Sequence, residues 1–449
     1  MNRGNVHIIS LGCPKNLVDS EVMAALLAKS GYRITSQADE GHIILINTCA
    51  FILPAKEESI DEILKIAEWK SQRKGACTHL VVTGCLPQRY GRALERELPE
   101  VDLFLGVGEI GNIVDHLNGL TQTEAPRRRS IIDKPTFLMN AKTPRLISTS
   151  PYTSYLKIAE GCSNRCSYCI IPTIRGRARS RAVEDILMEA ESLSMRGVKE
   201  VIIIAQDTTA YGRDLKGKPS LADLLRCLAS VKGMRWVRLM YAHPANLTDG
   251  TLESIASNEN VCNYMDIPVQ HIDDEILASM NRRGDSALVK KTIRRAREII
   301  PGVALRTSAI VGFPRETREK FNKLLSFIKE TRFDHLGVFT YSREEGTKAA
   351  SYPSHISKRE KELRRQIIME EQSVISYQIN QDLIGSIQEV MIEGKSDIPD
   401  HPYVGRCRRQ APEIDGVTYV KGKDLATGSL LSCKITETTE YDLFAEALP

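Results

Sequence analysis

A short stretch in the middle of the chain, residues 160–172, holds three cysteines in the spacing C-x3-C-x2-C. They are Cys162, Cys166 and Cys169, and they directly follow an apolar segment that predicts a β-strand. Three thiolates this close together can wrap one cuboidal iron–sulfur cluster, and no fourth ligand follows nearby. A four-iron cluster held by three cysteines keeps one iron open, and an open iron can bind a substrate. The chain is therefore expected to fold around a reactive cluster.

These three cysteines, here called the C-x3-C-x2-C array, resemble the motif of the radical S-adenosylmethionine (SAM) enzymes. An aromatic residue, Tyr168, stands just before the last cysteine of the motif. The resemblance implies a [4Fe-4S] cluster whose open iron chelates the amino and carboxylate groups of SAM. One electron would then cleave SAM to a 5′-deoxyadenosyl radical. The cofactor supplies the difficult chemistry, while the protein positions it and excludes water.

A zinc site or a disulfide framework would fit these cysteines less well. A structural zinc site normally closes with four ligands, and this run supplies three. A disulfide framework is disfavoured because the chain has an odd number of cysteines, 11 in all, and no secretory signal, so a cytoplasmic location is expected. No apolar run approaches the ~20 residues that a membrane helix needs, so no membrane association is expected.

Residues 5–119 alternate between apolar strands and amphipathic helices, which predicts a parallel sheet with helices on its faces. Strands are expected at residues 6–10, 42–47 and 79–82, and helices at 16–29, at 55–69 and from Pro87 onward.

Each of these expected strands is followed by a cysteine. Cys13, Cys49 and Cys85, here called the N-terminal array, are separated by intervals of 36 residues. Ligands of open α/β sheets bind at the carboxyl ends of the strands. The N-terminal array is therefore predicted to hold a second cluster. The alternative is three unrelated buried cysteines, since free cysteine is often buried as a small hydrophobe. Cys77 is typical of that case because it precedes its strand.

Residues 151–350 predict a partial (β/α)6 barrel. Six apolar strands separated by helical patterns are expected at residues 155–159, 201–205, 236–241, 263–267, 304–311 and 336–340. A barrel of this kind carries its functional loops at the carboxyl ends of its strands. Because the C-x3-C-x2-C array follows the first strand, its cluster is expected at the mouth of the barrel.

Tyr168 of the motif and three further residues are candidate SAM contacts. Gln206 opens a polar loop after the second strand, which suits the ribose and methionine ends of SAM, and Gly312 follows the fifth strand. Each of these loops alone would also fit an ordinary capping turn. Arg175 lies in a cationic run, residues 174–181, whose guanidinium forks would recognise a carboxylate of SAM or of an acidic substrate. The alternative is a solvated run of charge.

Longer stretches resemble the methylthiotransferase family of radical SAM enzymes. They are residues 10–20, 47–51 and 83–87 in the first domain, and 264–271 and 312–314 in the barrel. Arg315 departs from the family pattern, because relatives usually carry glycine after Gly-Phe-Pro, and this leaves the local turn open. The resemblance covers almost the whole chain. It implies an α/β protein with a radical SAM barrel and a small C-terminal all-β TRAM barrel.

The family resemblance also implies a reaction, the insertion of sulfur into an unactivated C–H bond with two [4Fe-4S] clusters. The C-x3-C-x2-C array would hold the SAM-cleaving cluster. The N-terminal array would hold an auxiliary cluster whose open iron carries the sulfur. One SAM would methylate that sulfur, and a second would yield the radical that abstracts hydrogen. The sequence does not indicate the sulfur donor or the reductase.

The charge of the C-terminal segment favours one branch of the family. Residues 376–449 hold 7 Lys and Arg against 12 Asp and Glu, a net charge of −5. An RNA-binding surface is expected to be basic, because neutralising phosphates supplies much of the affinity. An acidic module suits a basic protein partner instead. The resemblance then implies the ribosomal-protein branch, which methylthiolates the β-carbon of an aspartate on protein uS12, and residues 406–416 resemble that branch too.

Two alternatives remain at this point. The transfer-RNA branch modifies an adenosine, and Arg406, Arg408 and Arg409 would be its RNA contacts. An iron–sulfur electron carrier without catalysis is the other, although a carrier gains nothing from open irons. The expected domains are residues 1–119 (auxiliary cluster), 120–150 (linker, with Arg127–Arg129), 151–350 (barrel), 351–375 (connecting helix) and 376–449 (TRAM).

Overall fold

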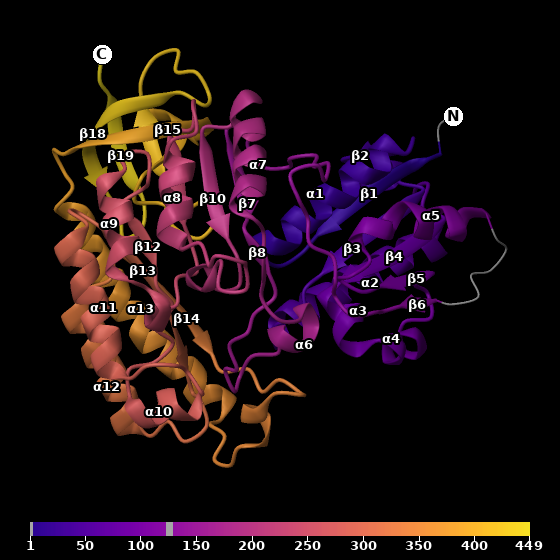
Figure 1. Ribbon diagram of the computed structural model, residues 1–449, viewed down its shortest axis with the longest axis horizontal. Helices are drawn as coiled ribbons and strands as arrows, with labels where there is room; N and C mark the ends of the chain where they lie inside the picture. Colours follow the sequence, from indigo (N-terminus) through magenta and orange to yellow (C-terminus); the bar gives the residue numbers. More distant parts are fainter. Residues whose placement is uncertain (1–2, 123–128) are drawn as a thin grey trace. The chain divides into compact units, whose positions relative to one another are not determined.

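The structure is a computed structural model that describes residues 3–122 and 129–449 (Figure 1). The chain forms two compact units. The first comprises residues 1–148, 157–181 and 342–350, and the second comprises residues 149–156, 182–341 and 351–449. Of the expected run Arg127–Arg129, the first two residues lie outside the described part of the chain. Among the described helices, none is both long enough and apolar enough to cross a bilayer.

The first unit is built on a parallel six-stranded sheet with the order β2-β1-β3-β4-β5-β6. The predicted alternation of strands and helices is confirmed. The strands are β1 Asn5–Ser10, β2 Arg33–Thr35, β3 Ile43–Thr48, β4 His79–Gly84, β5 Leu103–Leu105 and β6 Ser130–Ile131. The helices are α1 Pro14–Lys29, α2 Leu53–Ser71, α3 Cys85–Tyr90, α4 Arg92–Glu97, α5 Ile113–Gln122 and α6 Ile171–Arg175.

Helices cover both faces of this sheet, as Figure 1 shows. On one face, α1 and α5 bury side chains such as Met23 and Leu117 against the strands. On the other face, α2 and α4 do the same with Ile63 and Leu94. Because both faces are covered, the strands carry apolar residues on both sides, and every residue of β3 is buried.

Part of the expected linker belongs to the fold of the first unit. Strand β6 adds to the edge of the sheet beside β5. Further on, Ser148 donates to the Glu21 carboxylate of α1 through its backbone N–H (2.8 Å) and its hydroxyl (2.9 Å). Arg145 pairs with the same carboxylate at 2.5 Å. A buried carboxylate on α1 therefore holds a segment that composition alone suggested to be solvated.

The second unit contains the predicted partial barrel. Strands β7, β10 and β11 form one sheet and β12, β13 and β14 another, and a bridge between Val237 and Val261 joins them. The strands are β7 Thr153–Lys157, whose last residue belongs to the first unit, β10 Glu200–Ile204, β11 Trp236–Leu239, β12 Tyr264–Asp266, β13 Ala304–Val311 and β14 His335–Thr340. The helices around them are α7 Val183–Met195, α8 Leu221–Ala229, α9 Asp249–Ser257, α10 Asp274–Ser279, α11 Ser286–Ile299 and α12 Arg318–Thr331.

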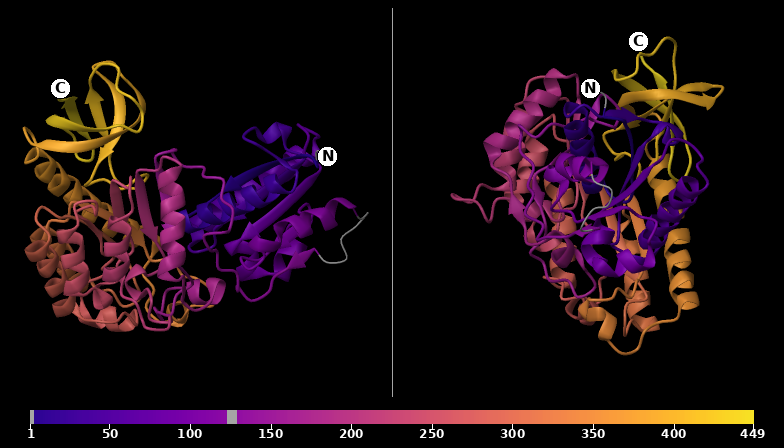
Figure 2. Two further views of the ribbon diagram at one scale, coloured as in Figure 1. Left: turned by 45° about the horizontal axis from the view of Figure 1, so that its top comes forward. Right: turned by 90° about the vertical axis from the view of Figure 1, so that its right-hand side faces the viewer.

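Helix α13 (Lys358–Gln381) leads into a closed five-stranded barrel in the order β15-β16-β17-β19-β18, drawn in yellow in Figure 2. The expected small C-terminal barrel is thus confirmed. Its core includes Val390, Tyr403 and Ile435. The strands are β15 Ile387–Ile398, β16 His401–Cys407, β17 Thr418–Lys421, β18 Leu430–Thr438 and β19 Leu443–Ala447.

A loop of the C-terminal barrel, residues 408–415, packs against the amino ends of the strands of the larger barrel. Arg408 donates to the carbonyl of Val261, just before β12, at 2.7 Å. Arg409 donates to the carbonyl of Gly302, just before β13, at 3.0 Å. Gln206 and Gly312 follow the carboxyl ends of β10 and β13. The loop therefore closes the end of the barrel opposite to these two candidate SAM contacts.

Candidate functional site

The N-terminal array is assembled by three neighbouring strands of the first unit. Cys13, Cys49 and Cys85 follow β1, β3 and β4, which lie next to one another in the sheet. The parallel registers align the ends of these strands, with Ser10 opposite Asn47 and Thr48 opposite Gly84. The expected common edge is therefore present. Helix α3 begins at Cys85, two residues before the expected Pro87.

Two glycines let the backbone fit closely around these cysteines. Gly12 has a φ of +88°, and a Cβ there would lie 2.5 Å from the Cβ of Cys49 and 3.0 Å from its sulfur. Gly84 has a φ of +99°, and its Cβ would lie 2.4 Å from Oδ1 of Asn47. Any larger residue at position 12 would push into the space beside the Cys49 thiol.

Electrostatics separate the three thiols. Burial alone would raise the pKa of Cys13, but Lys15 and Arg175 outweigh it and hold that pKa below its usual value. Burial, together with the negative charge that Cys13 would carry, raises the pKa of Cys49. Burial raises the pKa of Cys85 to about 12, against the opposing effect of Arg175. The three thiols influence one another, so they lie within a single electrostatic environment. Cys13 also precedes helix α1, whose amino end favours a thiolate.

The C-x3-C-x2-C array lies in a loop of the same unit, between β8 (Ala159–Glu160) and β9 (Arg179–Ser180). The backbone N–H of Cys162 donates to the carbonyl of Gly176 at 3.0 Å, and that of Cys169 donates to the carbonyl of Cys166 at 3.1 Å. These bonds pull the loop into a compact turn that ends in α6.

The donor chemistry of both arrays suits iron–sulfur clusters, whose ligands are cysteine thiolates. Within residues 3–122 and 129–449, no three His, Cys, Asp or Glu side chains converge closely enough to bind a single metal ion. A cuboidal cluster makes a different demand, because each cysteine binds a different iron and the sulfurs stand further apart. The assignment of these cysteines as cluster ligands therefore remains a prediction, and the residues present are compatible with it.

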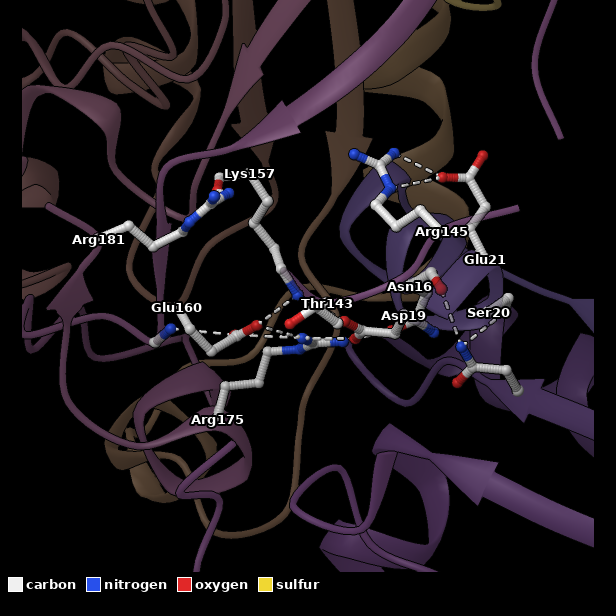
Figure 3. A network of polar contacts seen from close by, with 12 residues as sticks. Asn16, Asp19, Ser20, Glu21, Thr143, Arg145, Lys157, Glu160, Arg175 and Arg181 are labelled. Carbon is white, nitrogen blue, oxygen red and sulfur yellow. Dashed lines mark hydrogen bonds and ion pairs between the residues drawn. The ribbon is translucent and has the colours of Figure 1, made fainter. Parts of the chain in front are cut away.

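Arg175 takes a different place from the one that its cationic run suggested. Its side chain is 2% exposed, and Nη1 lies 3.1 Å from both carboxylate oxygens of Glu160 and 3.0 Å from Oδ2 of Asp19. Nη2 donates to Oδ1 of Asn16. Figure 3 shows the guanidinium lying between Glu160 and the α1 residues. The fork expected to bind a carboxylate of SAM or substrate is occupied by carboxylates of the chain itself.

Lys157 completes this buried network (Figure 3). Its Nζ lies 2.5 Å from Asp19 and 3.0 Å from Glu160, and the lysine is 2% exposed. Burial would raise the pKa of Glu160, but Arg175 and Lys157 outweigh it and hold that pKa far below its usual value. The two cations and two carboxylates join Glu160, two residues before Cys162, to helix α1, which follows Cys13.

The other candidate SAM contacts are spread over both units. Tyr168 lies within the cysteine loop of the first unit, whereas Gln206 and Gly312 lie in the second unit, after β10 and β13. The Glu316 carboxylate accepts from the backbone N–H groups of Gly312 and, at 3.1 Å, of Phe313, which fixes this turn. Arg315 has a φ of +69°, the left-handed region that glycine favours.

Sequence reasoning missed Asn16, Asp19, Lys157 and Glu160. The available signal was weak, because Asp19 and Lys157 are 138 residues apart in the chain. The one local hint was the glutamate directly before Gly-Cys, Glu160, which the structure shows to be buried.

Three family models match the chain in the order of the observed elements. The model described as "Uncharacterized protein family UPF0004" matches residues 5–106. The Radical SAM superfamily model matches residues 156–328, and the TRAM domain model matches residues 384–448.

Relatives of known assignment match over the full length. Ribosomal protein uS12 methylthiotransferase RimO of Syntrophus aciditrophicus is 61% identical, covering 100% of this chain and 99% of its own. The protein of the same name from Geobacter sulfurreducens is 48% identical, covering 99% and 98%. The chain belongs to the RimO family. The cysteine arrays and the acidic C-terminal barrel are thus features of a RimO family member.

Solved structures support the fold of this RimO family member. Radical S-adenosylmethionine methyltransferase TsrM from Kitasatospora setae, with cobalamin and a [4Fe-4S] cluster bound, has a TM-score of 0.54 and 14% identity, covering 90% of this chain and 82% of its own. At this identity the likeness concerns the fold alone.

Proposed function

We propose that this chain methylthiolates the β-carbon of an aspartate on ribosomal protein uS12, in the cytoplasm. The observation that carries the proposal is the 61% identity, over the whole chain, to a protein named as a uS12 methylthiotransferase. The assembly of Cys13, Cys49 and Cys85 at one edge of the sheet supports it, because this reaction requires a second cluster besides the one that cleaves SAM.

Two [4Fe-4S] clusters and SAM, once bound, would supply the radical that removes hydrogen and the sulfur and methyl group that replace it. The C-x3-C-x2-C array would hold the SAM-cleaving cluster, and the N-terminal array would hold the auxiliary cluster. Three cysteines for each cluster leave one iron of each open. Tyr168, Gln206 and Gly312 remain the proposed SAM contacts.

The surface charge of the C-terminal barrel supports a basic protein as the substrate. Arg406, Arg408 and Arg409, the expected RNA contacts of the alternative, all point into the second unit. Arg406 pairs with Glu200 at 2.6 Å, Arg408 donates to Val261 and Arg409 pairs with Asp334. The arginines expected to bind transfer RNA thus have internal partners.

Apart from these three arginines, the cations of residues 376–449 are four lysines, and the 12 Asp and Glu of the same segment outnumber them. We propose that this acidic surface docks the basic substrate protein, because opposite potentials steer association and suppress partners of the wrong charge.

Intact-mass analysis tests the proposed reaction. The anaerobically reconstituted enzyme is incubated with SAM, sulfide and reductant, together with uS12 in one reaction and transfer RNA in another. A methylthio mass gain on an aspartate of uS12 is the expected result. A gain on transfer RNA alone would overturn the proposal in favour of the other branch, and the absence of 5′-deoxyadenosine would leave only an electron carrier.

Two matched variants assign the arrays. Cys166→Ala is expected to abolish release of 5′-deoxyadenosine from SAM, because it removes a ligand of the SAM-cleaving cluster. Cys49→Ala is expected to keep that release and to lose methylthiolation. Cys227→Ala is the control, since Cys227 lies on α8 outside both arrays. Retained methylthiolation in Cys49→Ala would remove the N-terminal array from the reaction.

A further inference from the structure

Arg175 is the side chain through which the C-x3-C-x2-C loop reaches the N-terminal array. It ends helix α6, six residues after Cys169. Its guanidinium is buried and points to Asn16 on α1, three residues after Cys13 (Figure 3). A fully buried arginine is costly unless its hydrogen bonds and charge are matched, so its placement here has a specific structural basis.

The two ends of this guanidinium have different partners. Both carboxylates of the network, Glu160 and Asp19, lie within 3.1 Å of Nη1. Nη2 instead donates to Oδ1 of Asn16, and the same oxygen lies 3.8 Å from the sulfur of Cys85. The negative groups of the chain are thus gathered on one side, and the other side faces the N-terminal array.

We propose that Arg175 is a positioning residue of the N-terminal array. Its fixed positive charge, which shares the Oδ1 of Asn16 with the sulfur of Cys85, raises the reduction potential of the cluster that the array would hold. This inference rests on the proposed function, which assigns that cluster to the array. Positive charge and hydrogen bonds near the sulfurs favour the reduced, more negative state of an iron–sulfur cluster.

A purely structural role is the competing hypothesis, in which Arg175 only joins α6 to α1. Arg145 provides a matched control. It is also buried, with a side chain 4% exposed, and it also pairs with a carboxylate of α1, Glu21, at 2.5 Å. Asp19 and Glu21 are two residues apart on this helix, so both arginines pair with the same element.

The test is a redox titration, followed by electron paramagnetic resonance, of the full chain with both clusters loaded. The signal that is lost in Cys49→Ala reports the auxiliary cluster, because that variant lacks a ligand of the N-terminal array. In Arg175→Met the midpoint potential of that signal is expected to shift downward, and auxiliary iron is expected to be lost more readily on gel filtration. Arg175→Lys, which keeps the charge and loses the fork, is expected to show a smaller downward shift. Arg145→Met is expected to match the wild type.

The inference would be overturned if the midpoint potential of the auxiliary cluster were the same in Arg175→Met as in Arg145→Met. If Arg175→Met does not fold, Arg175→Gln decides, because glutamine removes the charge and keeps an amide donor. A wild-type potential in Arg175→Gln would overturn the inference equally. A wild-type chain that binds only one cluster would overturn the proposed function and this inference with it. If the wild type binds two clusters and the Arg175 variants show no shift in the auxiliary midpoint potential, only this inference is overturned and the proposed function is unaffected.

Discussion

Glu200 and Arg406 form an ion pair at 2.6 Å, and their side chains are 0% and 2% exposed. Glu200 begins strand β10 of the larger barrel, and Arg406 lies in β16 of the C-terminal barrel. Arg238 of β11 pairs with the same carboxylate at 2.8 Å. The acidic C-terminal barrel is therefore attached to the larger barrel by buried charge, not only by helix α13.

Replacing Glu200 with glutamine is expected to destabilise the second unit by about 3–5 kcal/mol, because it leaves two buried arginines without their shared counter-charge. Denaturant unfolding followed by circular dichroism measures the loss. Glu362→Gln is the control, since the Glu362–Arg365 pair lies on the exposed face of α13, and its removal is expected to leave the stability almost unchanged. Equal losses of stability in the two variants would show that the buried pair contributes no more to stability than the exposed pair.

The same pair predicts a dependence on acid. Burial would raise the pKa of Glu200, but Arg406 and Arg238 outweigh it and lower the pKa to about 2. A carboxyl whose pKa is depressed in the folded state stabilises the protein above its unfolded pKa, near 4.5, and loses that contribution as pH falls toward 2. The contribution is roughly 3 kcal/mol.

A pH series of unfolding measurements on the wild type and Glu200→Gln tests this expectation. The stability difference between the two proteins is expected to be constant above pH 5 and to shrink steadily below pH 4.5. A difference that stays constant down to pH 3 would contradict it.

Arg315 predicts a stabilising substitution. Its φ of +69° places an arginine in the left-handed region, where a Cβ costs about 1 kcal/mol. Arg315→Gly is expected to raise the stability of the second unit by up to about 1 kcal/mol, less the entropy that glycine loses on folding. Arg315→Ala removes the same side chain but keeps the Cβ, so it isolates the backbone effect and is expected to gain nothing. A gain of equal size in both variants would assign the effect to the side chain.

Local patterns were sufficient to predict the larger barrel, three of the six strands of the sheet, and the edge at which the N-terminal array meets. Apolar runs of strand length alternate with helical ones, and parallel strands bring their carboxyl ends together. Strands β2, β5 and β6 were not predicted, and the C-terminal barrel was expected from the family resemblance alone. Cys13, Cys49 and Cys85 were found because each repeats the same position in a strand–helix unit.

The contacts that hold the site together were not predictable in this way. The pairing of Lys157 with Asp19, and of Arg406 with Glu200, joins residues 138 and 206 positions apart. Local spacing does not encode such partners, and a charged residue in isolation reads as solvent-exposed. Arg175, Arg406 and Arg409 were therefore assigned to external ligands, whereas the structure gives each of them a carboxylate partner within the chain.

Gly12 offers the most local test of the N-terminal array. Gly12→Ala would place a Cβ 2.5 Å from the Cβ of Cys49 and 3.0 Å from its sulfur, on a backbone with a φ of +88°. We expect the variant to lose the auxiliary cluster and to keep the other, so that iron falls from about eight to about four per chain while SAM cleavage continues. Iron analysis and 5′-deoxyadenosine release measure the two effects.

The control for Gly12→Ala is Gly119→Ala in the same unit, on helix α5, where an added Cβ would meet nothing within 4 Å. That substitution is expected to leave both clusters in place and to stabilise the helix slightly, because alanine favours the helical conformation over glycine. Full iron content in Gly12→Ala would mean that the Cys49 thiol can move away from the new methyl group and still bind, so the tight approach at Gly12 would not be needed to form the cluster.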